Sequence, residues 1–430
     1  MTELPAFELF QSELGSGVRL SIAPLPSVHR AAVSLHVKSG PRYEPAELGG
    51  ISHFLEHMLH RGIPGHATAH AQALAFEDLG SELSAATYAD HTVLSASGPP
   101  ETIGAVLSLL GEVCRSPLFG DIEVERGIVR EEILESSNDR GMLVDPDDLV
   151  VEGAFPEHAL GRPITGTVDA LERFDVAALR RVHAAHYVGS GLCVTVAGPV
   201  SPKEIEDIAE RAFAGLPRGA ALTDAAPPPL DGPGIVHARD TTTQTALRVA
   251  FRAPGQLSPN EVACELLLRL LDDGMSTRLY RRICDELGLA YDVSASYEAF
   301  EGIGLVTLAS ECAHARVPEL LGELLAIVSN LRDHGPTASE LDKARRRASW
   351  QLRALVDDPD QLAAFIGLSA LTGRSPRPEQ RLAELHAVDR ERLIETAASV
   401  FRRESLVVAA VGQQTPAQRR KVDQVVRGFR

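Results

Sequence analysis

The chain of 430 residues has few cysteines, few aromatic residues and no long apolar run. Its five cysteines are scattered, odd in number and never spaced as C-x-x-C, which argues against a disulfide framework and against a cysteine zinc site. No apolar stretch approaches the roughly 18 residues of a membrane-spanning helix. The first residues also lack the basic and apolar regions of a signal peptide. We therefore expect a cytoplasmic protein that does not associate with membranes.

Positive charge is scarce as well. The chain has 42 basic and 59 acidic residues, giving a net charge of −17, which argues against nucleic-acid binding. Its apolar content of 44% and charged content of 23% are typical of a globular protein. The chain is too long for a single hydrophobic core of ordinary size, and its length suits two domains of about 200 residues each.

The most informative stretch is residues 49–60, which contain His-x-x-Glu-His, the reversed zinc-peptidase signature. On a helix, His53 and His57 project from one face one turn apart, so both imidazoles can ligate one Zn²⁺. Glu56 lies on the same side and can act as general base toward a water molecule. Catalytic zinc requires a third protein ligand and an open fourth position, so the motif predicts one more ligand elsewhere.

Apolar residues nearly encircle this predicted helix, which indicates that it is buried. A histidine or glutamate inside such a helix must be hydrogen-bonded or metal-bound, because an unpaired buried polar group is costly. Hydrogen bonding alone is the alternative interpretation of the motif. His60, His66, His70 and His91 lie nearby, but none has ligand spacing to it.

The pattern of segments predicts an α+β protein built of two homologous units, each an antiparallel-rich β-sheet with helices packed on one face. In the first half we expect strands over 7–10, 18–22, 31–37, 82–86, 92–97 and 192–198, and helices over 51–59, 69–79, 102–115, 122–138 and 202–213. Residues 33–40 resemble 247–255, and 192–198 resemble 406–412, both offset by about 214. This repetition indicates an internal duplication.

A proline- and glycine-rich stretch, 217–234, predicts a linker between the units. We therefore expect a zinc-binding catalytic unit over 1–216 and a homologous unit over 235–430. The repeat of the motif helix, near 261–273, contains no histidine. Only the first unit can hold the metal, so we expect one Zn²⁺ per chain.

The third ligand should come from an acidic helix downstream, and 123–135 is the only suitable segment in the first unit. Glu125 and Glu132 are two turns apart and share a face beside the apolar stripe. Spacing alone does not choose between Glu131 and Glu132.

These motifs resemble the pitrilysin-type inverzincin metallopeptidases, of the small two-domain kind that includes the mitochondrial processing peptidase subunits. In that family the motif helix is followed about 76 residues later by Glu-Arg-x-x-x-x-x-Glu. Here Glu125-Arg126 and Glu132, 75 residues after His57, fit the pattern. Further matches are residues 160–167, 186–187, 274–279 and 288–291. The resemblance implies Glu132 as zinc ligand and Glu125 as an acid that supports a ligand through hydrogen bonds.

The resemblance also implies an Arg and a Tyr, seven residues apart in the second unit, that bind the substrate or polarise its scissile carbonyl. Tyr291 matches the Tyr, but Cys284 stands where the family has Arg. Arg281 and Arg282 lie one turn earlier and could replace it, and we take Arg282 as a substrate-binding candidate. A partner chain could also supply the group.

In the family an edge strand with Asn-Ala-Tyr-Thr accepts the substrate as an added strand, and here Ser84-Ala85-Ala86-Thr87 stands in its place. Backbone pairing survives this change, whereas the Asn and Tyr side-chain contacts are lost. The resemblance thus implies a zinc endopeptidase for short or unfolded peptides, working as a homodimer or as a heterodimer with a related peptidase-like chain. The alternatives are a catalytic subunit inactive without that partner and a non-catalytic scaffold subunit.

Overall fold

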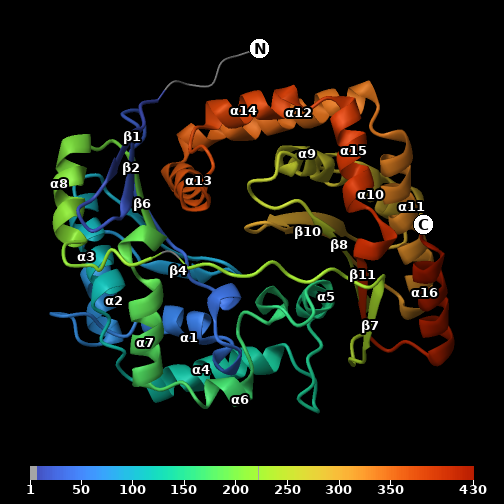
Figure 1. The fold of residues 1–430 in the computed structure, drawn as a ribbon, viewed down its shortest axis with the longest axis horizontal. Coiled ribbons are helices and arrows are strands. Elements are labelled where there is room, and N and C mark those ends of the chain that lie inside the picture. The colour runs from blue at the N-terminus through green and yellow to red at the C-terminus, as the bar shows by residue number, and fades with distance from the viewer. Residues whose placement is uncertain (1–6, 221) are drawn as a thin grey trace. The chain divides into compact units, whose positions relative to one another are not determined.

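The computed structural model describes residues 7–220 and 222–430, and the chain divides into two compact units. The first unit contains the residues up to 133, then 163–225 and 351–379, and the second contains 134–162, 226–350 and 380–430. Each unit is built on one β-sheet with helices packed against it, which confirms the predicted α+β class with two similar units (Figure 1). In the described part of the chain, no helix combines the length and the apolar character needed to cross a membrane.

The sheet of the first unit has six strands in the order β1-β2-β6-β3-β5-β4. They are β1 (Phe10–Glu13), β2 (Arg19–Pro24), β3 (Ala31–Val37), β4 (Ser84–Thr87), β5 (Thr92–Gly98) and β6 (Leu192–Gly198). All pairs are antiparallel except β2 with β6. The strand expected over 7–10 is wrong in its bounds, because pairing with β2 begins only at Phe10, opposite Ile22.

Helices of the first unit pack on both faces of this sheet and at its ends. They are α1 (Ile51–Met58), α2 (Ala69–Glu77), α3 (Ile103–Arg115), α4 (Ile122–Glu135), α6 (Val168–Leu171), α7 (Val176–His186), α8 (Pro202–Ala212) and α13 (Pro359–Thr372). Val33, Leu35 and Val194 point into the main hydrophobic core, which α3 and α8 close. Alternate residues of the same strands face the opposite side.

The sheet of the second unit has the order β7-β11-β8-β10-β9. Its strands are β7 (Gly234–Ala238), β8 (Thr245–Ala253), β9 (Val293–Ala299), β10 (Gly304–Cys312) and β11 (Leu406–Val411). The helices that lie wholly or mainly in this unit are α5 (Pro146–Ala154), α9 (Glu261–Leu271), α10 (Arg278–Tyr280), α11 (Val317–His334), α12 (Ala338–Ala354), α14 (Pro378–Ala387), α15 (Arg390–Val400) and α16 (Pro416–Gly428).

The two sheets have the same topology once β1 is set aside. Strands β2, β6, β3, β5 and β4 of one correspond in order to β7, β11, β8, β10 and β9 of the other. The repeated segments seen in the sequence fall on β3 and β8 and on β6 and β11, which confirms the duplication. Between the end of α8 at Ala212 and the start of β7 at Gly234, the described residues form no helix or strand, and residue 221 lies outside them.

Each unit also contains one helix taken from the other half of the chain. Helix α5, from the first half, packs on β8 and β11 in the second unit, and α13, from the second half, packs on β3 and β6 in the first (Figure 1). The units are therefore discontinuous in sequence, whereas the division expected at 217–234 was continuous. The predicted architecture, with helices on one face of each sheet, also lacked this covering helix on the second face.

The exchanged helices are equivalent members of the duplication. Each begins with an Asp whose side chain accepts hydrogen bonds from the first turn, Asp145 in α5 and Asp358 in α13, followed by proline. Each also has a glycine at the closest approach to its sheet. An added Cβ at Gly367 would lie 2.4 Å from His36 Nδ1, and one at Gly153 would lie 2.8 Å from Val407 Cγ1.

The close approach of α13 predicts a specific cost for a methyl group. Replacing Gly367 by Ala should lower the free energy of unfolding by about 1–3 kcal/mol, because the new Cβ overlaps the buried His36 ring. Gly322→Ala in α11, where an added Cβ meets no atom within 4 Å, is the matched control and should be neutral or stabilising by up to about 1 kcal/mol. Urea unfolding followed by circular dichroism measures both. Equal midpoints for the two variants would contradict the proposed packing constraint.

Candidate metal centre

Helix α1 is held in a fixed position by its N-terminal end. Gly50 precedes the helix with φ of 92°, and an added Cβ there would meet the backbone of Gly166 at 2.6 Å. The Glu44 carboxylate accepts hydrogen bonds from the backbone N–H groups of Gly50 (2.7 Å) and Ser52 (2.6 Å), a favourable place for an anion. The apolar side chains of α1 are fully buried, as predicted.

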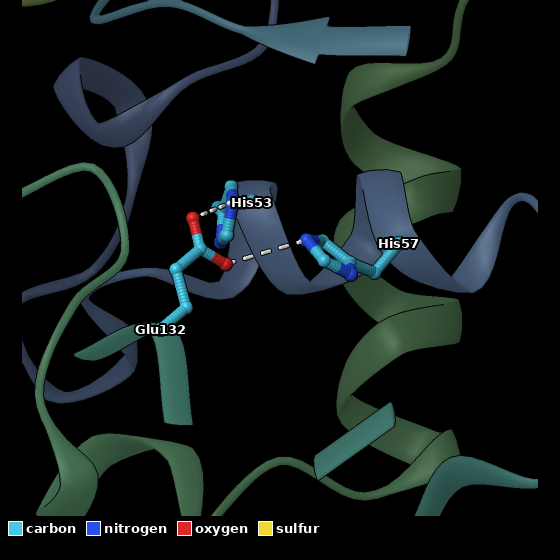
Figure 2. Close-up of side chains that lie close together, drawn as sticks. All are labelled: His53, His57 and Glu132. Carbon is cyan, nitrogen blue, oxygen red and sulfur yellow. Dashed lines mark ion pairs between the residues drawn. The ribbon is translucent and has the colours of Figure 1, made fainter. Parts of the chain in front are cut away.

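Three side chains meet at one point beside this helix (Figure 2). His53 Nε2 lies 3.3 Å from Glu132 Oε1, and His57 Nε2 lies 3.6 Å from Glu132 Oε2. Both histidines project from the same face of α1, and Glu132 reaches them from α4. Among the described residues this is the one group of three or more His, Cys, Asp or Glu side chains placed to hold a metal ion. The exposed Glu131 is not part of it.

The spacing of these atoms suits zinc. One ligand atom from each of the three residues lies within 4.8 Å of the other two. Tetrahedral zinc with bonds of about 2.0–2.1 Å separates its ligand atoms by about 3.3–3.4 Å, close to the observed His–Glu132 distances of 3.3 and 3.6 Å. Two imidazoles and one carboxylate are also a donor set of catalytic zinc, with room for a fourth ligand. The residues therefore fit the ion.

Glu125 supports the second imidazole from behind. Its Oε2 lies 3.1 Å from His57 Nδ1, so the nitrogen facing Glu132 remains the one available to a metal. The side chain of Arg61 contacts the other oxygen, Oε1. Sequence reasoning did not single out Arg61. It lies four residues after His57, but beyond the end of α1, where helical spacing no longer indicates which residues share a face.

The charges around His57 shift its protonation and that of two neighbouring glutamates. Burial by itself would lower the pKa of His57, but the hydrogen bond to Glu125 and the nearby carboxylates outweigh it and raise that pKa. Burial would raise the pKa of Glu125, yet the hydrogen bonds from His57 and Arg61 lower it. The hydrogen bond to His53 lowers the pKa of Glu132. The two glutamates are thus held as carboxylates, the form that binds a metal or orients its ligand.

Glu56 faces the edge strand β4. Its Oε2 accepts a hydrogen bond from Thr87 Oγ1 at 3.3 Å, and its charge acts on His57. Strand β4 is the last strand of its sheet and pairs only with β5. The residues expected to accept a peptide, Ser84 to Thr87, therefore form a sheet edge next to α1.

The direction of the backbone groups on β4 follows from the adjoining turn. Tyr88 N–H donates to His91 C=O. Along an antiparallel strand, residues that bond to the neighbouring strand alternate with residues whose N–H groups point away from it. The N–H groups of Ala85 and Thr87 therefore point to the open side of β4. In the described structure neither group has a hydrogen-bond partner. The equivalent edge strand of the second unit differs, because Ala295 N–H on β9 donates to Asp272 Oδ2 at 2.9 Å.

The second unit contains three further candidate residues, Tyr291, Arg282 and Cys284. Tyr291 lies in the loop before β9 and is 97% exposed. Arg282 is ion-paired with Glu323 (2.8 Å) and Glu286 (3.2 Å). Cys284 is half-buried, and burial raises the pKa of its thiol, so it resembles neither an arginine nor a reactive thiolate.

Two successive parts of the chain each match a known protein family. Residues 21–168 match the family described as insulinase (peptidase family M16), and residues 173–348 match the peptidase M16 inactive domain. The chain belongs to peptidase family M16. The first match contains all of the residues that converge at the candidate centre, and the second contains Arg282 and Tyr291.

Individual relatives agree with this assignment. An uncharacterized zinc protease of Rickettsia bellii is 26% identical over 398 residues, covering 91% of this chain and 94% of the relative. A protease of Helicobacter pylori has a similar structure, with a TM-score of 0.87, 19% identity and coverage of 95% of this chain and 100% of its own. A Pseudomonas fluorescens structure titled peptidase M16 inactive domain gives a TM-score of 0.86 at 19% identity, with 95% and 100% coverage. The two structures establish the fold.

The geometry distinguishes two adjacent glutamates. Glu132→Gln should lower zinc affinity by more than about 100-fold, because it removes a ligand rather than a supporting group, whose loss costs about 10–100-fold. Glu131→Gln, one residue away and outside the cluster, is the matched control and should retain one zinc per chain. Metal analysis after dialysis against a chelator of known affinity measures both. If the Glu131 variant lost zinc instead, Glu131 would be the ligand and the assignment to Glu132 would be wrong.

Proposed function

We propose that this chain is a zinc-dependent endopeptidase that hydrolyses short or unfolded peptides. The observation that carries the proposal is the convergence of His53, His57 and Glu132, with Glu56 on the same helix. The relatives named zinc proteases support it. A purely structural zinc site would be closed by four protein ligands and would have no use for an adjacent base.

In this proposal His53, His57 and Glu132 hold the metal. When bound, zinc supplies a Lewis acid that polarises a peptide carbonyl and makes a water molecule more acidic. Glu56 accepts the proton of the attacking water and passes it to the nitrogen of the leaving amine. Its hydrogen bond from Thr87 orients the carboxylate toward the strand that carries the peptide. Glu125 keeps the His57 ring turned so that Nε2 faces the metal.

The peptide is proposed to add to β4 as a further strand. The N–H groups of Ala85 and Thr87 point to the open side of this edge, so they can donate to carbonyls of an extended peptide. Such main-chain bonds depend little on sequence, and they require a substrate segment without its own secondary structure. Tyr291, almost fully exposed, is proposed to contribute its hydroxyl to the developing oxyanion.

A partner chain is proposed to complete the site. The resemblance calls for an arginine at position 284, which is Cys284 here, and the neighbouring Arg282 is already paired with two carboxylates. A homodimer or a heterodimer with a related peptidase-like chain would supply the missing cation. The competing proposal is a scaffold subunit without catalysis, which the description of residues 173–348 as an inactive domain favours for that region only, outside the residues of the candidate metal centre.

Removing the base tests catalysis separately from metal binding. Glu56→Gln should leave zinc stoichiometry unchanged and lower cleavage of a quenched fluorescent peptide library by at least about 100-fold, the usual contribution of a general base. The wild-type chain is assayed alone and together with any chain that co-purifies. Turnover retained by the variant would refute the role of Glu56. A zinc-loaded wild type that is inactive in both assays would support the scaffold proposal instead.

Proline at position 85 tests strand addition. Ala85→Pro removes the N–H that points to the open side, while the bonds from β4 to β5 remain. We expect KM for an extended peptide to rise roughly 3- to 10-fold, the worth of one hydrogen bond, with kcat little changed. Ala85→Val, which keeps the N–H, is the control. An unchanged KM in the proline variant would mean that peptides do not pair with this edge.

A further inference from the structure

Arg61 lies in the turn that follows α1 and is fixed there by a side chain from α2. Gln72 is buried at 2% exposure and contacts this turn twice. Its Oε1 accepts from Gly62 N–H at 2.8 Å, and its Nε2 donates to Leu59 C=O at 2.8 Å. The turn on either side of Arg61 is therefore held by buried hydrogen bonds, and the arginine starts from a defined backbone position.

From this position Arg61 reaches the carboxylate behind the second histidine. Its guanidinium contacts Oε1 of Glu125, whereas Oε2 of the same carboxylate lies 3.1 Å from His57 Nδ1. Both side chains are largely removed from solvent, with 14% of Arg61 and 8% of Glu125 exposed. Occupying one oxygen fixes the rotation of the carboxyl group, so the other oxygen is aimed at the imidazole.

The two histidines differ in this respect. His53 Nδ1 is buried and has no hydrogen-bond partner in the described part of the chain, so its ring is positioned by packing and by Glu132. His57 is more exposed, with 23% of its side chain open compared with 9% for His53. A partly exposed imidazole ring can rotate unless a hydrogen bond holds it. Glu125, itself held by Arg61, provides that hydrogen bond.

We propose that Arg61 is a positioning residue of the metal centre, acting through Glu125 to hold the His57 ring in its ligating orientation before the metal arrives. The inference rests on the proposed zinc site and adds a residue that lies outside the ligand set. Among the described residues, Arg61 also supplies the one arginine or lysine side chain paired with Glu125, beside a group that already contains Glu56 and Glu132. Without it the carboxylate would lose both its fixed rotation and its counter-charge.

A double-mutant cycle on zinc affinity tests this mechanism. Arg61→Gln should weaken zinc binding about 10-fold and Glu125→Gln about 10- to 100-fold, as found for groups that orient metal ligands. Because Arg61 acts only through Glu125, the double variant should bind zinc no more weakly than Glu125→Gln alone. Affinities come from competition with a chromophoric chelator, which requires no peptidase activity. Arg61→Lys, which keeps the charge, should lie between wild type and Arg61→Gln.

The control removes an arginine from the same neighbourhood without touching Glu125. Arg130→Gln on α4 breaks an exposed pair with Glu172 and should leave zinc affinity unchanged. Thermal unfolding of the metal-free variants verifies that each remains folded. Unchanged affinity in Arg61→Gln, or a further loss in the double variant, would overturn the inference while leaving the zinc site in place. A wild type that binds no zinc would overturn the proposed function, and this inference with it.

Discussion

Two imidazoles and a carboxylate that face one another at the side of a buried helix form the interaction on which the site depends. Such a group is costly to bury unless every member is paired or bound to a cation. Glu132 lies within 3.6 Å of both histidines, and Glu125 occupies the remaining nitrogen of His57. These contacts keep the group assembled without a metal, so the ion would enter a site whose ligands already point at one another.

The sheet that supports the site is stabilised by a helix from the distant half of the chain. Helix α13 covers the side of β3 and β6 that α3 and α8 leave open, and it can do so only because Gly367 brings it against His36. The same arrangement recurs in the second unit with α5 and Gly153. Since each unit needs a helix from the other half, neither half of the chain, cut at the linker, contains a complete unit.

The parts predicted from the sequence are those in which local spacing determines geometry. His53 and His57 lie on one helix, so the helical repeat alone places them together, and the repeated strand segments revealed the duplication. Glu132 required the family resemblance, because no local rule brings α4 to α1. Arg61 was missed because it follows the last turn of α1, and the exchange of α5 and α13 was missed because an apolar helix face does not indicate which sheet it covers. The sequence did contain a signal that α5 and α13 are equivalent. The Asp-Pro pair that begins each helix is repeated at an offset of 213, and the glycine that contacts the sheet is repeated at an offset of 214.

The second unit has the same fold but lacks the histidines of the candidate metal centre. Its α9 follows β8 and contacts β9 as α1 follows β3 and contacts β4, but buried leucines and no histidine line it. Its N-terminal Glu261 is held by Arg381 instead, an ion pair within the protein. Because one copy of the fold is complete with apolar packing and internal ion pairs, metal is not needed to fold this architecture. The histidines and glutamates that α9 lacks lie on α1 and α4 of the first copy, beside the open edge of β4, whereas the edge of β9 is bonded by Asp272.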